Sequence, residues 1–268
     1  MNKRVLWIIL AILMFMSSII LIVYWLWGNG MFGPVSESSP TTTYEDFTYP
    51  SLTDPSVTVT DPVVQTTEPS ETTEYVSPVD FEQLQKVNPD IIGWIYMSNP
   101  AINLPVLRSP DDDSFYLYHD AAKEYAREGS LFVEHEYNSD DFSDMCTIIY
   151  GHRMSNGTMF GTMQAVFSEE GAFDDPQYIV IYLPHSQKIY QICATIPADS
   201  RHILYYNDFY SMSQYEEFID SVYNTEGVEV NLLEDLRPRY GERLLILSSC
   251  LWGDRSSRYL VIAKEIGS

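Results

Sequence analysis

The chain has 268 residues, and its 38 acidic and 15 basic side chains give a formal net charge of −23 at pH 7. So acidic a protein would repel phosphates, which argues against nucleic acid or an anionic lipid surface as a partner. The length allows one large domain or two small ones, but the composition changes along the chain and divides it into three segments.

The first segment contains an uncharged apolar run, Val5 to Trp27, with only two serines. The run is long enough to cross the hydrocarbon core of a membrane as a helix. A cleaved signal peptide is the alternative, but the run exceeds a usual signal-peptide core and no small-residue cleavage site follows it. Lys3 and Arg4 precede the run, and the next basic residue is Lys86. This charge bias predicts that residues 1–28 form a single-pass membrane anchor with a cytoplasmic N-terminus and an extracellular remainder.

The second segment, residues 29–78, is dense in Ser, Thr, Pro, Asp and Glu. Such a composition cannot bury enough apolar surface to fold, so we expect an extended and self-repelling linker. The linker would hold the following domain away from the bilayer, within the wall layer. We interpret it as a passive spacer without a binding function of its own.

The third segment, residues 79–268, is predicted to be one folded domain. Ser77 and Pro78 are expected to start a short helix over VDFEQLQKVN, with Ser77 as its cap. Beyond Pro89, short runs rich in Ile, Val, Tyr and Leu alternate with Gly, Pro, Asn and Asp turns, which predicts a mostly β domain closed or nearly closed into a barrel. The predicted strands are IIGWIYM, INLPVL, CTIIYG, YIVIYL, IYQICATI, RLLILSS and RYLVIAKEI.

One amphipathic helix is predicted among the later strands, from Ser213 to Asn224. Ser213 and Glu216 match a capping box, and apolar residues recur at helical spacing behind them. Such an apolar stripe is more often a buried helix face than a binding site for a partner, so we expect the helix to pack on the barrel. The stripe consists of Tyr215, Phe218, Ile219 and Val222.

The chain contains three cysteines, an odd number for an extracellular domain, so at least one is free unless two chains are linked. Cys146 and Cys193 lie in apolar strands and are interpreted as small core residues rather than a disulfide. Cys250 ends a strand and meets a polar loop, where a thiol is available for reaction. It needs a neighbouring base or cation, because a free thiol is mostly protonated at neutral pH.

His152 is the best-placed histidine for acid–base chemistry, because it stands where a predicted strand gives way to a polar turn. The other histidines lack the close pairs of zinc sites and are interpreted as surface or structural residues. The acidic run Asp111 to Asp113 lacks the glycine turn and spaced acids of a calcium loop, so no metal site is predicted. These other histidines are His119, His135, His185 and His202.

Arg258 begins the last predicted strand, and its side chain is expected to share a face with Leu260. If the last two strands form a hairpin, the loop returns Arg258 to the level of Cys250. A permanent cation would then stand where an acyl oxyanion forms. Arg255, in the same loop, is a competing candidate.

From about Asn88 to the C-terminus the chain resembles the class B sortases. The resemblance implies an eight-stranded sortase barrel with an N-terminal helix and an added helix before the cysteine-bearing strand. It also implies that Cys250 is the nucleophile, His152 the proton-transfer partner and Arg258 the oxyanion stabiliser. The matching stretches, in the family's order, are NPDIIGWIYM, INLPVL, DSFYLYHD, GSLFVEHE, IIYGHRMSNGTMFG, ILSSC and RYLVIAKEI.

The family reaction is a transpeptidation at the surface of Gram-positive cells, without a cofactor. A thiolate attacks the carbonyl after the Thr of a C-terminal sorting signal, and an amine of the cell wall precursor or a pilin lysine resolves the acyl-enzyme. Leu117 and Ser248 match positions that line the signal groove. The chain departs from the family at Ser249, usually Thr, which keeps a hydroxyl. It also departs at Asp113, often Asn, which would put an acid near the peptide groove and leaves the preferred signal open. No acid stands two residues after the cysteine, where the chain has Trp252.

Two alternatives remain at this stage. A wall L,D-transpeptidase also combines Cys, His and Arg, but it usually has Gly directly before the cysteine and Arg two residues after it. This chain has Ser249 and Trp252 there. A non-catalytic binding domain on a stalk explains the anchor and the linker, but it leaves the grouping of Cys250, His152 and Arg258 as a coincidence.

Overall fold

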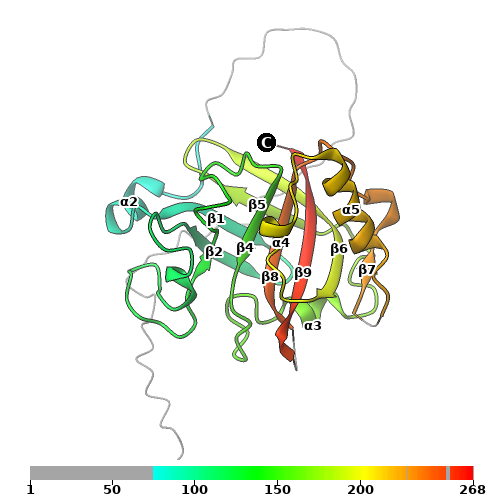
Figure 1. Ribbon diagram of the computed structural model, residues 1–268. Coiled ribbons are helices and arrows are strands. Elements are labelled where there is room, and N and C mark those ends of the chain that lie inside the picture. The colour runs from blue at the N-terminus through cyan, green and yellow to red at the C-terminus, as the bar shows by residue number, and fades with distance from the viewer. Residues whose placement is uncertain (1–74, 228, 252–253, 268) are drawn as a thin grey trace, which may run out of the picture. The chain divides into compact units, whose positions relative to one another are not determined.

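The computed structural model describes residues 75–227, 229–251 and 254–267 (Figure 1). The predicted anchor, residues 1–28, and nearly all of the predicted linker lie outside these ranges. Among the residues that are described, no helix combines the length and apolarity that a membrane crossing requires.

Eight strands close into a barrel in the order β5, β1, β2, β3, β4, β8, β9 and β6, and β6 pairs back with β5. A ninth strand, β7, extends the sheet from β6. This confirms the expected mostly β, eight-stranded barrel. The strands are β1 (Ile91–Met97), β2 (Ile102–Leu107), β3 (Leu131–Phe132), β4 (Cys146–Tyr150), β5 (Tyr178–Tyr182), β6 (Gln187–Ala198), β7 (Asn231–Leu232), β8 (Leu244–Leu251) and β9 (Asp254–Gly267).

In the described ranges, one helix precedes the first strand, and the other helices lie in the connections between strands (Figure 1). They are α2 (Phe81–Val87), α3 (Met163–Phe167), α4 (Ile203–Tyr206) and α5 (Met212–Tyr223), with 3-10 turns at Phe115–Leu117 and Glu234–Leu236. The expected N-terminal helix is α2, and the expected helix before the cysteine-bearing strand is α5.

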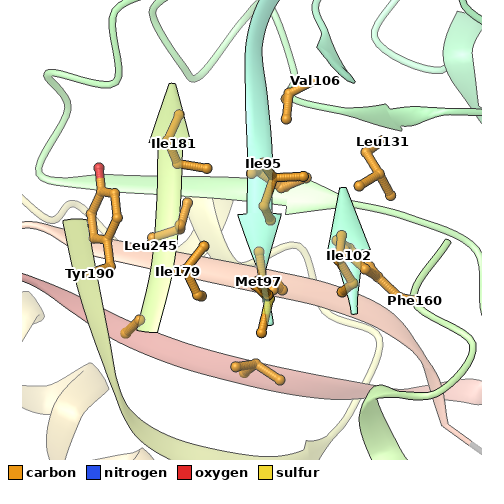
Figure 2. Close-up of a cluster of buried hydrophobic side chains, with 14 of the residues drawn as sticks. Ile95, Met97, Ile102, Val106, Leu131, Phe160, Ile179, Ile181, Tyr190 and Leu245 are labelled. Atoms are coloured by element: carbon orange, nitrogen blue, oxygen red, sulfur yellow. The ribbon is translucent and has the colours of Figure 1, made fainter. Parts of the chain in front are cut away.

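The barrel wall separates two apolar layers, because alternate residues of a strand point to opposite faces. Leu245 and Leu247 of β8 belong to the interior cluster, part of which Figure 2 shows. Leu244 and Ile246 belong to a second cluster on the outer face, together with the apolar side of α5. Burying an apolar side chain of this size contributes about 1.5–3 kcal/mol, so the stripe of α5 holds the helix on the barrel. All four predicted stripe residues are buried, which confirms that prediction: Tyr215, Phe218, Ile219 and Val222.

Both predicted helix caps are wrong. The carboxylate of Asp80 caps α2 by accepting a hydrogen bond from the Gln83 N–H at 3.0 Å. Ser77 lies before the helix, which begins only at Phe81, and its hydroxyl accepts from the Val79 N–H within the preceding turn. In α5 the N-cap is Ser211, without a side-chain cap bond, and Ser213 already lies inside the helix.

Cys146 and Cys193 are buried free thiols in the outer apolar cluster, which confirms their interpretation as core residues. Burial raises the pKa of Cys146 well above its usual value and that of Cys193 to about 12. Both thiols therefore stay protonated and unreactive in the folded protein.

Candidate active site

Cys250 and Arg258 are direct partners across the antiparallel pair β8 and β9. The hairpin expected from the sequence is therefore present. Directly opposed residues of a sheet share a face, so the thiol and the guanidinium emerge on the same side of the wall. Both residues are partly exposed.

His152 leaves the sheet beside Cys250. Strand β4 runs parallel to β8, with Tyr150 level with Ser248, and the Gly151 N–H donates to the Ser248 carbonyl at 3.1 Å. His152 and Cys250 each stand two residues beyond this pair, at the same edge of the barrel. The register thus places Cys250 opposite Arg258, and the end of β4 that leads to His152 lies beside β8. β9 is the last strand of the chain and ends near the marked C-terminus (Figure 1).

These residues face outward from the barrel. Ser248 is opposed by Leu260, which belongs to the outer apolar cluster, whereas Tyr259 points into the interior cluster. Cys250 and Arg258 lie two residues from Ser248 and Leu260 on the same strands, so they share the outer face. The expectation that Arg258 and Leu260 lie on one face is confirmed.

The imidazole of His152 is held by the main chain of Leu117. Its Nε2 lies 2.8 Å from the Leu117 carbonyl oxygen. A carbonyl can only accept a hydrogen bond, so Nε2 carries the proton and donates it. In the neutral ring Nδ1 is then the nitrogen that can take a proton. The ring of Tyr118 lies 5.6 Å from that of His152, centroid to centroid.

A thiol, an imidazole with a free basic nitrogen and a guanidinium at one edge are the groups needed for acyl transfer through a covalent thioester. The thiol supplies the nucleophile and the imidazole moves protons. The guanidinium can stabilise the negative charge that develops on a carbonyl oxygen. The arrangement therefore fits a cysteine enzyme acting on an amide or ester carbonyl.

The comparisons with known proteins point to one family. No protein-family model matches the chain. Sortase B of Staphylococcus aureus is 26% identical over 195 residues, which cover 72% of this chain and 77% of that protein. Sortase B of Listeria monocytogenes is 36% identical over a shorter stretch of 99 residues, 37% of this chain and 39% of that protein.

Solved structures agree in fold. A mutant form of Clostridium perfringens sortase B superposes with a TM-score of 0.60 at 27% identity, covering 70% of this chain and 86% of that one. A Staphylococcus aureus sortase B–substrate complex gives a TM-score of 0.58 at 26% identity, covering 69% and 84%. The curated relatives and the solved structures support a class B sortase. The sortase relatives indicate a cysteine transpeptidase.

Tyr150 is a residue of the sortase site that the sequence reasoning missed. It is level with Ser248 on the face that carries Cys250. Burial raises the pKa of its hydroxyl, the Glu134 carboxylate adds to that rise, and the charge of Arg258 opposes it. Arg258 lies on the same outer face, opposite Cys250 in the register. The available signal was the place of Tyr150 at the end of the predicted strand CTIIYG, directly before Gly151 and His152.

The two residues matched to the signal groove lie at this site. Ser248 is buried on β8, two residues before Cys250, and Leu117 contacts His152 through its carbonyl. Asp113 has a structural partner, since its carboxylate accepts hydrogen bonds from the main-chain N–H groups of His135 and Glu136. The side chain of Arg255 lies outside the described residues.

The remaining histidines of the sortase are structural or exposed, as interpreted from the sequence. His119 stacks on Phe115 with ring centroids 3.9 Å apart. His202 accepts a hydrogen bond from the Tyr205 N–H and donates to Glu134 at 2.9 Å. Among the residues that the structure describes, no group of three or more His, Cys, Asp or Glu side chains could hold a metal ion.

Proposed function

We propose that the sortase cleaves the C-terminal sorting signal of other proteins after a Thr and transfers them to an amine. The observation that carries this proposal is the alignment of Cys250 with Arg258 across β8 and β9, with His152 at the adjoining end of β4. Three groups with complementary roles in acyl transfer would not meet by chance at one sheet edge.

In the first half-reaction the Cys250 thiolate attacks the carbonyl carbon after the Thr, forming a C–S bond and an oxyanion. The Arg258 guanidinium stabilises that oxyanion. The C–N bond then breaks, and the imidazolium of His152 gives a proton to the leaving amine. The product is a thioester on Cys250.

In the second half-reaction an incoming amine attacks the thioester, and His152 accepts a proton from it. The new C–N bond forms as the C–S bond breaks and the thiolate leaves. We propose an amine of the cell wall precursor or a pilin lysine as the acceptor. The residues that would line the groove for the sorting signal are Leu117, Tyr150 and Ser248.

We further propose that residues 1–28 anchor the sortase in the cell membrane, with residues 29–78 as the linker and the catalytic domain outside the cell. The uncharged run of Val5 to Trp27 and the basic residues before it support this orientation. The sortase B–substrate complex of Staphylococcus aureus supports a protein with a sorting signal as the partner.

The deciding experiment traps the acyl-enzyme. The full-length protein is incubated with a library of sorting-signal peptides and no acceptor amine. Mass spectrometry identifies the bound fragment, and digestion of the protein shows which residue carries it. A fragment ending in Thr should be found on Cys250, and Cys250→Ala should carry none. A library that leaves Cys250 unmodified, although iodoacetamide still labels it, would contradict the proposal.

A further inference from the structure

We propose that the main-chain carbonyl of Leu117 is the positioning group for His152, and that Gly129 keeps this carbonyl in place. The inference rests on the proposed role of His152 in proton transfer. In many nucleophilic enzymes a side chain orients the base. In this sortase the orienting group comes from the backbone of the connection between β2 and β3.

The contact selects one form of the imidazole. The Leu117 oxygen lies 2.8 Å from Nε2 and can only accept, so it is compatible with a proton on Nε2. The other neutral tautomer would set a nitrogen lone pair against the carbonyl oxygen. The imidazolium, in contrast, keeps the bond, because both of its nitrogens donate. The carbonyl therefore leaves Nδ1 as the nitrogen that can exchange a proton with the substrate.

Gly129 packs against the Leu117 carbonyl. Its φ is +57°, a conformation that favours glycine. A Cβ at this position would stand 2.5 Å from the Leu117 oxygen and 2.6 Å from the Tyr116 oxygen. The next residue, Ser130, donates its N–H to the Tyr116 carbonyl at 2.9 Å. The turn thus packs against the two peptide units that set where the Leu117 carbonyl points.

The same segment is tied to the N-terminal helix through Tyr116, which is only 1% exposed. Its hydroxyl donates to Asp90 at 2.6 Å and accepts from the Asn88 amide at 2.9 Å. Asn88 is the C-cap residue of α2, and Lys123 forms an ion pair with Asp90 at 2.8 Å. Tyr116 and Leu117 are neighbours in the chain, so the buried Tyr116 side chain links the end of α2 to the segment that contacts His152.

The side chain and the carbonyl of Leu117 can be tested apart. A substitution such as Leu117→Ala keeps the carbonyl and removes a candidate contact to the sorting signal, so it should raise KM and leave the pH profile unchanged. Gly129→Ala keeps the Leu117 side chain and displaces its carbonyl. Gly241→Ala is the matched control for backbone strain, because Gly241 has a φ of +98° and nothing lies within 4 Å of an added Cβ.

The primary test is the tautomer of His152 in the wild-type, full-length protein in detergent, read by NMR after selective 15N-histidine labelling. The signal is assigned by its loss in His152→Gln. We expect the neutral ring to carry its proton on Nε2. A proton on Nδ1 would overturn the proposal. This readout does not depend on turnover, so an inactive protein with the expected tautomer would refute the proposed function alone.

The second test compares Gly129→Ala with Gly241→Ala in single-turnover acylation across pH. Gly129→Ala should acylate at least about tenfold more slowly, with a displaced pH profile and a mixture of tautomers at His152. Gly241→Ala should match the wild type in all three measurements. A Gly129→Ala protein that folds and keeps the wild-type tautomer and pH profile would overturn the role of Gly129. If that variant fails to fold, the wild-type spectrum still decides the role of Leu117.

Discussion

Cys250 and Arg258 face each other across β8 and β9, and only the short hairpin between them separates the two residues in the chain. The sheet register therefore fixes the backbone of Arg258 opposite that of Cys250. A group held in this way can meet a developing charge without reorganising during the reaction.

Arg258→Lys should lower kcat by about 10²-fold or more, because lysine keeps the charge but loses the planar fork of donors that can hold an oxyanion. Single-turnover acylation with a cognate peptide measures the effect. Arg255→Lys is the control, since Arg255 shares the hairpin and the charge but does not oppose Cys250 in the register. Near-normal acylation by Arg258→Lys beside a collapse in Arg255→Lys would reverse the assignment.

The losses from Cys250→Ala and His152→Ala should be far from additive, because the two residues act as one unit. Cys250→Ala should abolish the thioester, and His152→Ala should block proton transfer while peptide binding largely survives. The double variant should be about as inactive as Cys250→Ala alone. Acylation rates and peptide affinity measured on all three proteins test this expectation. Losses that multiply would show that the residues act independently.

Alkylation should distinguish the three thiols. Iodoacetamide should modify Cys250 in the native protein and spare Cys146 and Cys193, whose pKa values are raised by burial. All three should react once the protein is unfolded. Peptide mass mapping before and after denaturant gives the result. Native labelling of Cys193 as fast as Cys250 would show that the outer apolar layer opens readily.

Alkaline pH should destabilise the fold through its buried tyrosines. Burial raises the pKa of Tyr150 and of Tyr190 above the ordinary value of 10.0. As pH rises, these hydroxyls lose their protons in the unfolded chain before they do in the folded protein, which favours unfolding. The folded state therefore keeps its full stability below pH 10 and loses stability as pH rises above that value. Denaturant unfolding at a series of pH values should therefore show a falling free energy of unfolding above about pH 10.

Tyr150→Phe should make this alkaline decline shallower, because it removes one of the groups responsible. Tyr205→Phe is the control, since that side chain is 68% exposed and should leave the pH dependence unchanged. An identical slope for the wild type and Tyr150→Phe would mean that Tyr150 ionises as freely in the folded protein as in the unfolded chain.

Protease added to intact, wall-stripped cells should remove the domain from Asp80 onward if Lys3 and Arg4 stay inside the cell. Immunoblots with tags on each end of the chain follow the two fragments. Full protection of the domain in intact cells, together with digestion after lysis, would place it on the cytoplasmic side and reverse the proposed orientation.

Much of the fold could be predicted from the sequence, because apolar residues recur within its strands and helix at the spacing typical of each element. Runs of β-branched and aromatic residues marked seven of the strands, and a stripe of four apolar residues marked α5. Strands β3 and β7 went unpredicted because each has only two residues, too few for an alternation to show. The caps failed for a different reason. Ser77 and Asp80 are both residue types that favour the start of a helix, as are Ser211 and Ser213, and the local turn decides where each helix begins.

Cys250 and His152 were recognisable because each stands near the end of a strand. Arg258 was expected to begin the last strand, but β9 already begins at Asp254, so Arg258 lies inside it. Tertiary structure alone decided how His152 is held. Leu117 lies 35 residues before it in the chain, and the contacting atom is a main-chain oxygen. Every residue carries such an oxygen, so no sequence pattern can identify the one that meets the imidazole. That depends on how the connection from β2 to β3 folds over the end of the barrel, around Gly129 and the buried Tyr116.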